Sequence, residues 1–489
     1  MQRRDFLRGV AASGALLALP DWARADAARD AYLANLPAHP RLAALGGCTA
    51  ESLSGTATVE GRWPTELNGT FYRNGPARFE LGGERYRHWF DGDGMVHAWR
   101  MAAGQVRHEA RFVRTLKYVE ESAAGQFLYP AIGTVIRRRP VANNDTMNTA
   151  NTNAVAHAGK LYALWEGGSA TELDPSTLAT RGAHAWRDDL AAMPFSAHPK
   201  VTPDGVLWNF GVVPFADKLV LWRVDPDGSL GKFSMLAIPQ LRMVHDFVVT
   251  ARYMVFLVPP FDVQDAPHTA YLGAHVWNGK RPLRAVVVDR ADFTLRRIVE
   301  LPARMVFHLG NGWDENDMVR FDACLSADDS GLRALEGAMR GESRSEARTD
   351  SVLVTLNLRN GTARCETLLR RTEFPRVAAA DVGGRYRQLF VTTSRSTTEF
   401  GMTGVASVDV QSGRVDRYDY GAHWIVEEHI PVPKASGRGQ WLIGAAYDVR
   451  QRQTALAVFD GARLACGPVA RARLPYGAPL CFHGNFVAA

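Results

Sequence analysis

The sequence predicts an all-β protein built as a β-propeller, and three observations support this fold class. Short runs rich in Val, Leu and aromatic residues recur from about residue 55 onward. Turn-forming Asp-Gly and Asn-Gly pairs separate several of these runs, and the composition contains 44 Gly, 25 Pro and 12 Trp. Many short strands without a break suit a propeller, because radial closure leaves few exposed sheet edges.

The predicted strands are short runs bounded by turn residues. They include residues 160–165, 205–210, 253–258, 285–289, 351–356, 388–392 and 441–444. We expect hairpins, in which glycine tolerates a positive φ, at four pairs: Asp204-Gly205, Asp227-Gly228, Asn360-Gly361 and Asp460-Gly461. Helical patterns are few and cover residues 26–36 and 328–340.

The length of 489 residues would suggest three domains at about 150 residues per domain. No low-complexity linker interrupts the strand pattern, however, and closed β architectures hold more residues in one unit. We therefore predict a single β-propeller domain over residues 26–489.

Residues 1–25 have the character of an export signal. The basic start Arg3-Arg4-Asp5-Phe6-Leu7 is typical of a twin-arginine signal, and an apolar run over residues 10–19 follows it. This run is too short to span a bilayer, and small residues place the expected cleavage after Ala25. We expect a periplasmic protein, or one otherwise exported by the twin-arginine route. The alternative is an ordinary exported segment whose paired arginines are accidental.

Charge and cysteine content exclude several classes of protein. The chain has 57 basic and 51 acidic residues, and its longest basic run is Arg137-Arg138-Arg139. This is no basic footprint for nucleic acid, so no nucleic-acid partner is expected. Five scattered cysteines without a C-x-x-C pair argue against a disulfide scaffold and against a zinc ribbon.

Four of the 14 histidines share one sequence context. Each lies beside a turn or a strand end, next to apolar residues: His198, His245, His308 and His483. Their separations of 47, 63 and 175 residues match no local metal motif, and H-E-x-x-H is absent from the sequence. From these residues alone, a joint metal site and ordinary structural histidines both remain open.

Nine stretches of the chain resemble, in order, motifs of the carotenoid cleavage oxygenase family. They are Asn-Gly-Thr-Phe-Tyr-Arg-Asn-Gly-Pro (68–76), Phe-Asp-Gly-Asp-Gly-Met-Val-His (90–97), Ala-Asn-Thr-Asn (150–153), Ala-Leu-Trp-Glu-Gly-Gly (163–168), Ala-His-Pro-Lys (197–200), His-Asp-Phe (245–247), Phe-His (307–308), Glu-Phe-Pro-Arg (373–376) and Phe-His-Gly (482–484). The resemblance covers roughly residues 55–486. The chain departs from the family pattern at Gly312-Trp313, Cys481 and Phe486, and none of these departures removes a candidate ligand.

The resemblance implies a seven-bladed β-propeller with a dome of loops and helices over one face. It also implies one Fe²⁺ per chain on the propeller axis, bound by four histidines. On the matching motifs these ligands would be His198, His245, His308 and His483. Imidazole is a suitable ligand for iron, and converging blades would explain how ligands so far apart in sequence meet.

The resemblance further implies residues around these ligands. A ligating histidine needs an acceptor for its other N–H, and the family uses three glutamates. The matching positions are Glu166, Glu373 and Glu428; Glu427 is adjacent to the third, and His429 replaces an expected Pro. Thr152 resembles the family's threonine that crowds an open iron position.

The family cleaves an activated C=C bond with O₂ into two carbonyl products, within an apolar tunnel. Stilbene-cleaving members have a lysine before the first glutamate, where it serves the substrate's phenol. This chain has Trp165 there, which cannot play that acid–base role. We therefore expect an apolar polyene, a carotenoid or apocarotenoid, as the substrate together with O₂. A stilbene-cleaving enzyme, a family isomerase and an inactive ligand-binding propeller remain alternatives.

Residues 127–139 combine an apolar run with three terminal arginines. Such a segment can enter an anionic membrane interface. It can equally be a buried part of the dome with exposed arginines. Neither the oligomeric state nor the double bond that is cleaved follows from the sequence.

Overall fold

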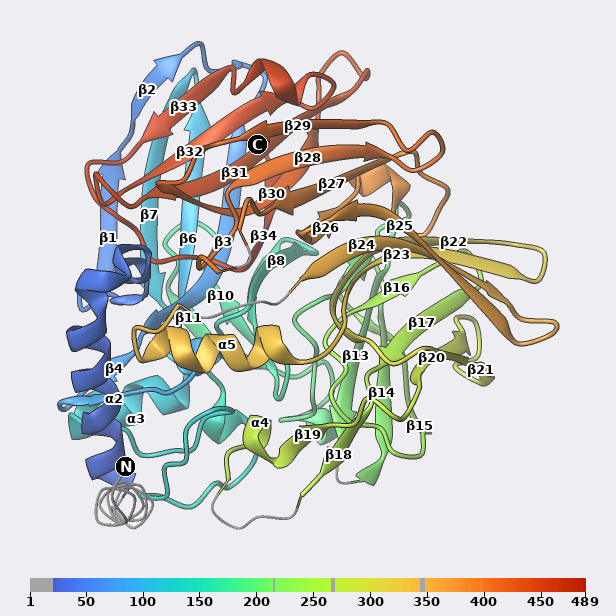
Figure 1. Cartoon of the computed structure of the whole chain (residues 1–489), viewed down its shortest axis with the longest axis horizontal. Helices are drawn as coiled ribbons and strands as arrows, with labels where there is room; N and C mark the ends of the chain where they lie inside the picture. The colour runs from blue at the N-terminus through green and yellow to red at the C-terminus, as the bar shows by residue number, and fades with distance from the viewer. Residues whose placement is uncertain (1–20, 214–215, 265–268, 344–347, 397) are drawn as a thin grey trace, which may run out of the picture.

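The computed structural model describes residues 21–489 apart from 214–215, 265–268, 344–347 and 397. Seven sheets of four or five antiparallel strands are arranged in a ring, which confirms the seven-bladed β-propeller (Figure 1). The predicted twin-arginine motif at residues 3–7 lies outside the described residues.

The two ends of the chain close the ring together. Strand β34 (His483–Ala488) pairs with β3 (Gly69–Arg78), and β2 (Thr58–Gly61) pairs with β33 (Ala470–Arg473). One blade therefore has the order β1-β7-β6-β3-β34, and its neighbour has the order β2-β33-β32-β31-β30. Both blades combine early and late strands, so main-chain hydrogen bonds hold the ring shut (Figure 1).

Each blade has an innermost strand, from which the sheet runs outward. The innermost strands are β34, β8 (Asn153–His157), β12 (Lys200–Val201), β16 (Phe247–Val249), β22 (Met305–Glu315), β26 (Thr372–Arg376) and β30 (Trp424–Pro433). The other strands of the blades are β1 (Ser52–Thr56), β6 (Asp93–Ala102), β7 (Gln105–Phe112), β9 (Lys160–Leu164), β10 (Ala170–Leu173), β11 (Thr180–His184), β13 (Leu207–Val213), β14 (Lys218–Val224), β15 (Leu230–Ala237), β17 (Tyr253–Val258), β20 (Leu283–Asp289), β21 (Leu295–Leu301), β23 (Met318–Ser326), β24 (Thr349–Asn357), β25 (Thr362–Arg370), β27 (Gln388–Thr393), β28 (Gly404–Asp409), β29 (Val415–Asp419), β31 (Gln440–Asp448) and β32 (Gln453–Asp460). Two small hairpins, β4 (Glu80–Leu81) with β5 (Glu84–Arg85) and β18 (Phe261–Val263) with β19 (His275–Trp277), lie outside the blades.

All seven predicted strand runs coincide with observed strands, namely β9, β13, β17, β20, β24, β27 and β31. Three of the predicted turns place glycine at positive φ: Gly205 (82°), Gly228 (88°) and Gly361 (77°). At Asp460-Gly461 β32 and β33 form the expected antiparallel hairpin, but not the expected tight turn, because the short helix η8 (Leu464–Cys466) lies between them. This longer connection does not require a positive φ at Gly461.

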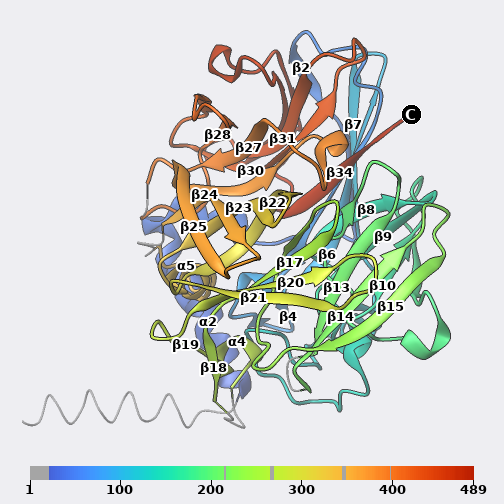
Figure 2. The same cartoon turned by 90° about the vertical axis from the view of Figure 1, so that its right-hand side faces the viewer.

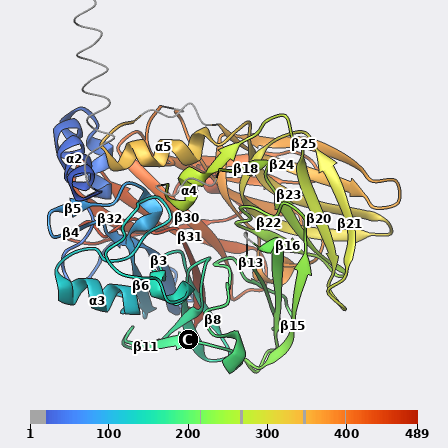
Figure 3. The same cartoon turned by 90° about the horizontal axis from the view of Figure 1, so that it is seen from below.

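The predicted helices correspond to α2 (Asp21–Asn35) and α5 (Ser330–Met339), which the structure supplements with α3 (Leu116–Ala124) and the short α4 (Tyr271–Ala274). Figure 3 shows α2, α4 and α5 on one side of the blades, and Figure 2 shows the C-terminus on the opposite side. The expected cleavage point after Ala25 falls within α2. Among the described residues, no helix combines the length and hydropathy needed to cross a membrane.

The hydrophobic core lies mainly between neighbouring blades. Every residue of β17 is buried, whereas the outer strand β29 alternates exposed and half-buried positions. In one cluster, β17 contributes Val255 and Leu257, which pack with Val319 and Phe321 of β23 in the next blade. Since strands near the axis are covered on both faces, they form a rigid frame for the side chains that point into the centre.

Candidate metal centre

Four histidines from four different blades converge at the centre of the ring. One ring nitrogen from each histidine lies within 4.8 Å of those of the other three. The Nε2 atom of His198 is 3.0 Å from that of His245, and the Nε2 of His308 is 3.3 Å from that of His245 and 3.2 Å from that of His483. Metal–nitrogen bonds of about 2.1 Å would place neighbouring ligands about 3 Å apart, so this spacing fits one shared ion.

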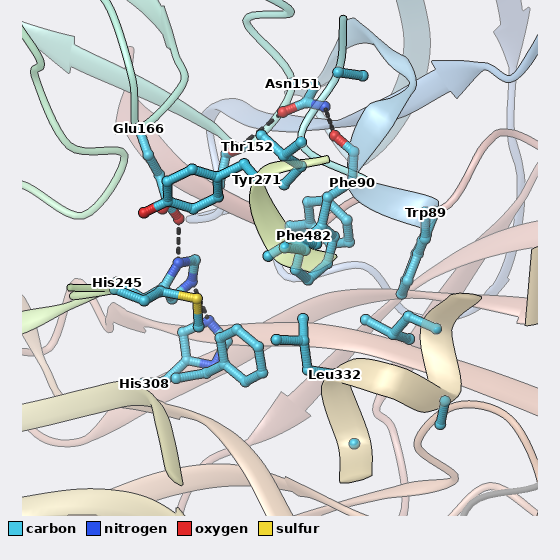
Figure 4. Close-up of a pocket in the computed structure, with 18 of the residues that line it drawn as sticks. Trp89, Phe90, Asn151, Thr152, Glu166, His245, Tyr271, His308, Leu332 and Phe482 are labelled. Atoms are coloured by element: carbon cyan, nitrogen blue, oxygen red, sulfur yellow. Dashed lines mark hydrogen bonds and ion pairs between the residues drawn. The ribbon is translucent and has the colours of Figure 1, made fainter. Parts of the chain in front are cut away.

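The innermost strands deliver these side chains. His308 lies in β22 and His483 begins β34, whereas His198 and His245 each lie two residues before a short innermost strand, β12 and β16. The other three blades supply glutamates: Glu373 from β26, Glu428 from β30, and Glu166 from the loop after β9 (Figure 4). Every blade therefore contributes one residue to the centre.

Irregularities in strand pairing accompany several of these residues. The register shifts in β22 between Val306 and Gly312, in β26 after Glu373, and in β30 between Val426 and His429. A bulge places two residues opposite one and re-aims their side chains. The bulges in these strands lie where His308, Glu373 and Glu428 turn toward the axis.

Each of the three glutamates contacts the outer nitrogen of one histidine. Glu166 accepts from Nδ1 of His245, and Glu373 accepts from Nδ1 of His308. Glu428 Oε1 lies 2.9 Å from Nδ1 of His483. These contacts fix the ring orientation and leave each Nε2 free to bind a metal.

Burial controls the charge of these imidazoles. It lowers the pKa of His483 to about 3, and burial together with the neighbouring histidines holds the pKa of His198 well below its usual value. Burial also acts to lower the pKa of His308, but the carboxylates of Glu373, Asp246 and Glu428 together leave that pKa above its usual value. Metals bind neutral imidazole, so His198 and His483 are ready to act as ligands at neutral pH.

The adjacent glutamates Glu427 and Glu428 share Arg73 but differ in their other partners. Burial acts to raise the pKa of Glu428, yet Arg376, His483 and Arg73 together hold it well below its usual range. Arg73 lies closer to Glu427, at 2.9 Å against 3.3 Å for Glu428, and Glu427 also accepts from the backbone N–H of Cys481 at 3.2 Å. Glu428 is therefore the carboxylate that orients His483.

Among the described residues, no glutamate is a hydrogen-bond or ion-pair partner of His198. The carboxylate beside it belongs to Asp246, whose Oδ1 is 3.9 Å from Nδ1 of His198, too far for a hydrogen bond. Sequence reasoning missed this aspartate, its partner Lys200, and the buried Arg73. The sequence did point to these three residues, because each of them lies within a stretch that carried the family resemblance.

Thr152 borders the cavity beside this centre and is buried. Its hydroxyl donates to Oδ1 of Asn151 at 2.9 Å, and Asn151 in turn donates to the carbonyl of Phe90 at 2.9 Å (Figure 4). The threonine side chain is therefore held in one orientation at the cavity wall. This placement suits a residue that restricts access, and it gives Thr152 no contact with a histidine among the hydrogen bonds described.

A cavity of about 1150 Å³ reaches the histidine cluster. His245, His308 and His483 line it together with many aromatic side chains, including Trp89, Phe90, Trp165, Phe210, Phe307 and Phe482. Figure 4 shows Phe90 and Phe482 in the same part of the cavity as His245 and His308. The metal site therefore opens onto an extended apolar space.

Residues 127–139 form part of the wall of this cavity. Phe127, Leu128 and Tyr129 are buried, and Ile132 and Val135 line the cavity. The expectation that this segment inserts into a membrane is therefore not supported, because its apolar side chains point inward. The structure matches the other alternative, a buried dome segment. Two of its exposed arginines, Arg138 and Arg139, form ion pairs with Glu84 and Glu120.

Comparisons with known proteins agree with this geometry. A sequence model of the retinal pigment epithelial membrane protein family matches residues 48–488. The chain is 30% identical over 464 residues to an apocarotenoid-15,15'-oxygenase from Synechocystis, covering 88% of this chain and 92% of that relative. It is 29% identical over 469 residues to lignostilbene-alpha,beta-dioxygenase isozyme III from Sphingomonas paucimobilis, covering 88% and 93%.

Solved structures give the same result. A variant of the Synechocystis apocarotenoid oxygenase superposes with a TM-score of 0.84 at 27% identity, covering 92% of this chain and 99% of that chain. A cobalt-substituted form of that enzyme superposes with a TM-score of 0.82. The family match spans nearly the whole chain and the four-histidine metal site is intact. The chain therefore belongs to the carotenoid cleavage oxygenase family, which is also called the retinal pigment epithelial membrane protein family, and it is an oxygenase of that family.

Proposed function

We propose that the protein is an Fe²⁺-dependent dioxygenase that cleaves a C=C bond of a carotenoid or apocarotenoid with O₂, giving two carbonyl products. The observation that carries this proposal is the apolar cavity of about 1150 Å³ that is lined in part by the histidine cluster. Pockets for drug-sized ligands usually enclose about 300–1,000 Å³. The larger space here favours a long polyene over a compact two-ring stilbene.

The proposal of iron rests on the donor set. Four imidazole side chains without a coordinating carboxylate suit iron, although they suit zinc, copper and nickel as well. The ion, once bound, would supply the activation of O₂ that amino-acid side chains cannot provide. The ligands would be His198, His245, His308 and His483, and the three glutamates would fix the orientation of their imidazole partners.

The protein's own contribution to the reaction is orientation and exclusion of water. Aromatic side chains such as Phe90, Phe307 and Phe482 bind a flat polyene by shape and apolar contact. They also remove water from around the scissile bond, which protects reactive species from side reactions. No protein side chain is required as a general base for this chemistry.

The residue before Glu166 supports the polyene assignment. Trp165 lines the cavity there and is only 9% exposed, so it contributes apolar surface beside the metal site. The residues described along the cavity include Arg137 and Arg371 but no lysine. An ammonium group that could favour a substrate phenolate is therefore missing from the described cavity wall.

A stilbene-cleaving activity is the second candidate, and one observation favours it. Tyr271 lines the same cavity and lies beside Glu166 in Figure 4. A phenolic substrate could exchange a hydrogen bond with this hydroxyl. Burial raises the pKa of Tyr271 above its usual value, so it would act as a neutral donor and would not deprotonate a phenol. An inactive binding propeller is disfavoured, because all four histidines and all three glutamates are in place.

The deciding experiment is a parallel assay of purified protein with Fe²⁺ and O₂ on β-apocarotenals and hydroxystilbenes. Bleaching of the polyene with aldehyde products supports the first candidate, and cleavage of only hydroxystilbene supports the second. The His245→Ala variant is the matched control and should be inactive. Full activity in that variant, or failure of the native chain to retain iron, would refute the shared mechanism.

We also propose that the protein is exported through the twin-arginine route and acts in the periplasm. The motif Arg3-Arg4-Asp5-Phe6-Leu7 and the apolar run after it support this assignment. Cell fractionation should find the native chain outside the cytoplasm and a variant with Arg3→Lys and Arg4→Lys inside it. Equal export of both chains would overturn the assignment.

A further inference from the structure

Lys200, which is partly buried, and the buried Asp246 form an ion pair next to the four histidines. Lys200 Nζ lies 2.9 Å from Asp246 Oδ1, and the two side chains are 15% and 2% exposed. Lys200 follows His198 by two residues, and Asp246 directly follows His245. The pair therefore joins the two chain segments that carry these two ligands.

The same pair also holds the segment that carries His308. Asp246 Oδ2 accepts from the backbone N–H of Leu309 at 2.8 Å, and Lys200 Nζ donates to the carbonyl oxygen of Leu309 at 3.4 Å. Leu309 lies in the bulged part of β22, where regular strand pairing is interrupted. Since buried backbone groups need partners, the ion pair satisfies both groups of one residue next to a ligand.

Regular strand pairing cannot by itself place these ligands. His198 and His245 lie outside the ladders, before strands of only two and three residues, and His308 lies in a bulge. The relative position of the three blades at the axis thus depends on side-chain contacts. The contacts of Asp246 and Lys200 reach all three segments.

We infer that the Lys200–Asp246 pair is a positioning device, which holds three of the four histidines at the spacing that one shared ion requires. A glutamate positions each of the other three histidines by contacting its imidazole nitrogen. The Lys200–Asp246 pair positions His198 differently, by holding the backbone segments around the ligands. The fourth ligand, His483, has a separate frame. Arg73 contacts Glu428 there and donates to the carbonyl oxygens of Cys481 and Phe482 at 3.2 and 3.3 Å.

The inference rests on the metal site and not on the identity of the substrate. Its test is therefore the binding of Co²⁺ by the full chain, followed by titration and by the visible absorption spectrum of the bound ion. The native chain sets the baseline, and a native chain that bound no Co²⁺ would contradict the metal site itself. Failure of the native chain to bind Co²⁺ is thus distinguishable from a loss of binding in the variants alone.

The variants are Asp246→Asn, Asp246→Ala and Lys200→Met. We expect the affinity for Co²⁺ to fall by about 10- to 100-fold in Asp246→Ala, with a changed spectrum, as is typical when the residues around metal ligands are altered. Asp246→Asn should lose less, because its amide oxygen can still accept from Leu309. Lys200→Met should shift the spectrum in the same direction.

The matched control is Asp93→Asn. Asp93 is 1% exposed and pairs with Arg78 at 2.7 Å, so its replacement also breaks a buried ion pair, and Asp93 does not line the cavity. We expect this control to lower Tm and to leave the Co²⁺ affinity and spectrum at native values. If Asp246→Ala and Lys200→Met lower Tm as the control does and bind Co²⁺ with native affinity and spectrum, the inference is overturned.

A double variant, Lys200→Met with Asp246→Leu, separates positioning from stability. Replacing a buried ion pair by apolar side chains is often neutral or stabilising. We expect Tm to recover toward the native value while the Co²⁺ spectrum stays altered, because Leu309 has lost both of its partners. Recovery of the native spectrum together with Tm would show a purely structural pair and would overturn the inference.

Discussion

Nδ1 of His483 lies 2.9 Å from Oε1 of Glu428, and both residues are almost completely buried at the point where the propeller ring closes. His483 begins the last strand of the chain, whereas Glu428 lies in the innermost strand of the neighbouring blade. The contact therefore links closure of the ring to formation of the metal site. A chain that fails to close the ring would also lack its fourth ligand.

Replacement of Glu428 tests this link. Glu428→Gln removes the charge that faces His483, and we expect the affinity for Co²⁺ to fall by about 10- to 100-fold. Glu427→Gln is the matched control, because Glu427 contacts Arg73 and the backbone of Cys481 but not the imidazole. We expect the control to lower Tm with a smaller change in affinity. An equal loss of affinity in both variants would contradict the assignment of Glu428.

The buried histidine pair His97 and His108 predicts loss of stability in acid. His97 Nδ1 lies 3.0 Å from His108 Nε2, and His108 Nδ1 lies 2.9 Å from the Tyr476 hydroxyl. Burial lowers the pKa of His108 to about 3 and holds that of His97 well below its usual value. In the unfolded chain both histidines should have a pKa of about 6.5. Below that pH the unfolded state takes up protons that the folded state excludes, so the folded state becomes less stable.

The expected size is a loss of about 1.4 kcal/mol in the free energy of unfolding per histidine and pH unit below about pH 6.5. Urea unfolding at several pH values between 7.5 and 5 measures it. In His108→Gln the pH dependence should be shallower by about one proton, since glutamine does not titrate. An identical slope in the variant and the native protein would show that His108 is already protonated in the fold.

Trp165→Lys should move specificity from polyenes toward phenolic stilbenes. The substitution places an ammonium group beside Glu166 and removes apolar surface from the cavity wall. We expect the ratio of kcat/KM for a hydroxystilbene to that for an apocarotenal to rise at least tenfold. Trp165→Phe, which keeps an aromatic ring, is the control and should retain the native preference. A native ratio in Trp165→Lys would contradict a role for this position in substrate choice.

Leu128→Ala distinguishes a buried wall from a membrane anchor. Leu128 is 4% exposed, so its truncation should cost about 2–5 kcal/mol in the free energy of unfolding. Leu116, which is 53% exposed, provides the control, and Leu116→Ala should change that free energy by less than about 0.5 kcal/mol. Co-sedimentation with anionic liposomes should be the same for Leu128→Ala as for the native chain. Unchanged stability combined with lost liposome binding would restore the membrane hypothesis.

Much of the fold could be predicted from the sequence, because strand patterns and turn residues act locally. The run at residues 253–258 coincides with β17, and glycines 205, 228 and 361 have the positive φ that their turns require. At Asp460-Gly461 the flanking strands pair as a hairpin, but the tight turn that this pair predicted is not formed. A local turn signal does not reveal that η8 occupies the connection between β32 and β33.

The candidate site divides in a similar way. Sequence motifs singled out the four histidines and three glutamates, but the motifs did not say which contacts these residues make. Residues 127–139 were open to two interpretations, because an apolar run has the same composition whether it faces a membrane or a cavity. Burial of Phe127, Leu128 and Tyr129 supports a dome segment, and liposome binding stays the test of membrane contact.

The sequence alone therefore determined the β class, the positions of most strands and the identity of the residues at the centre, since periodicity, turn chemistry and short motifs are properties of neighbouring residues. Only the tertiary structure decided that all seven blades meet at one metal site, that Glu428 and not Glu427 faces His483, and that Lys200 and Asp246 join three ligand segments. These relationships link residues tens to hundreds of positions apart. They exist only because ring closure and bulged inner strands bring those residues to a common axis.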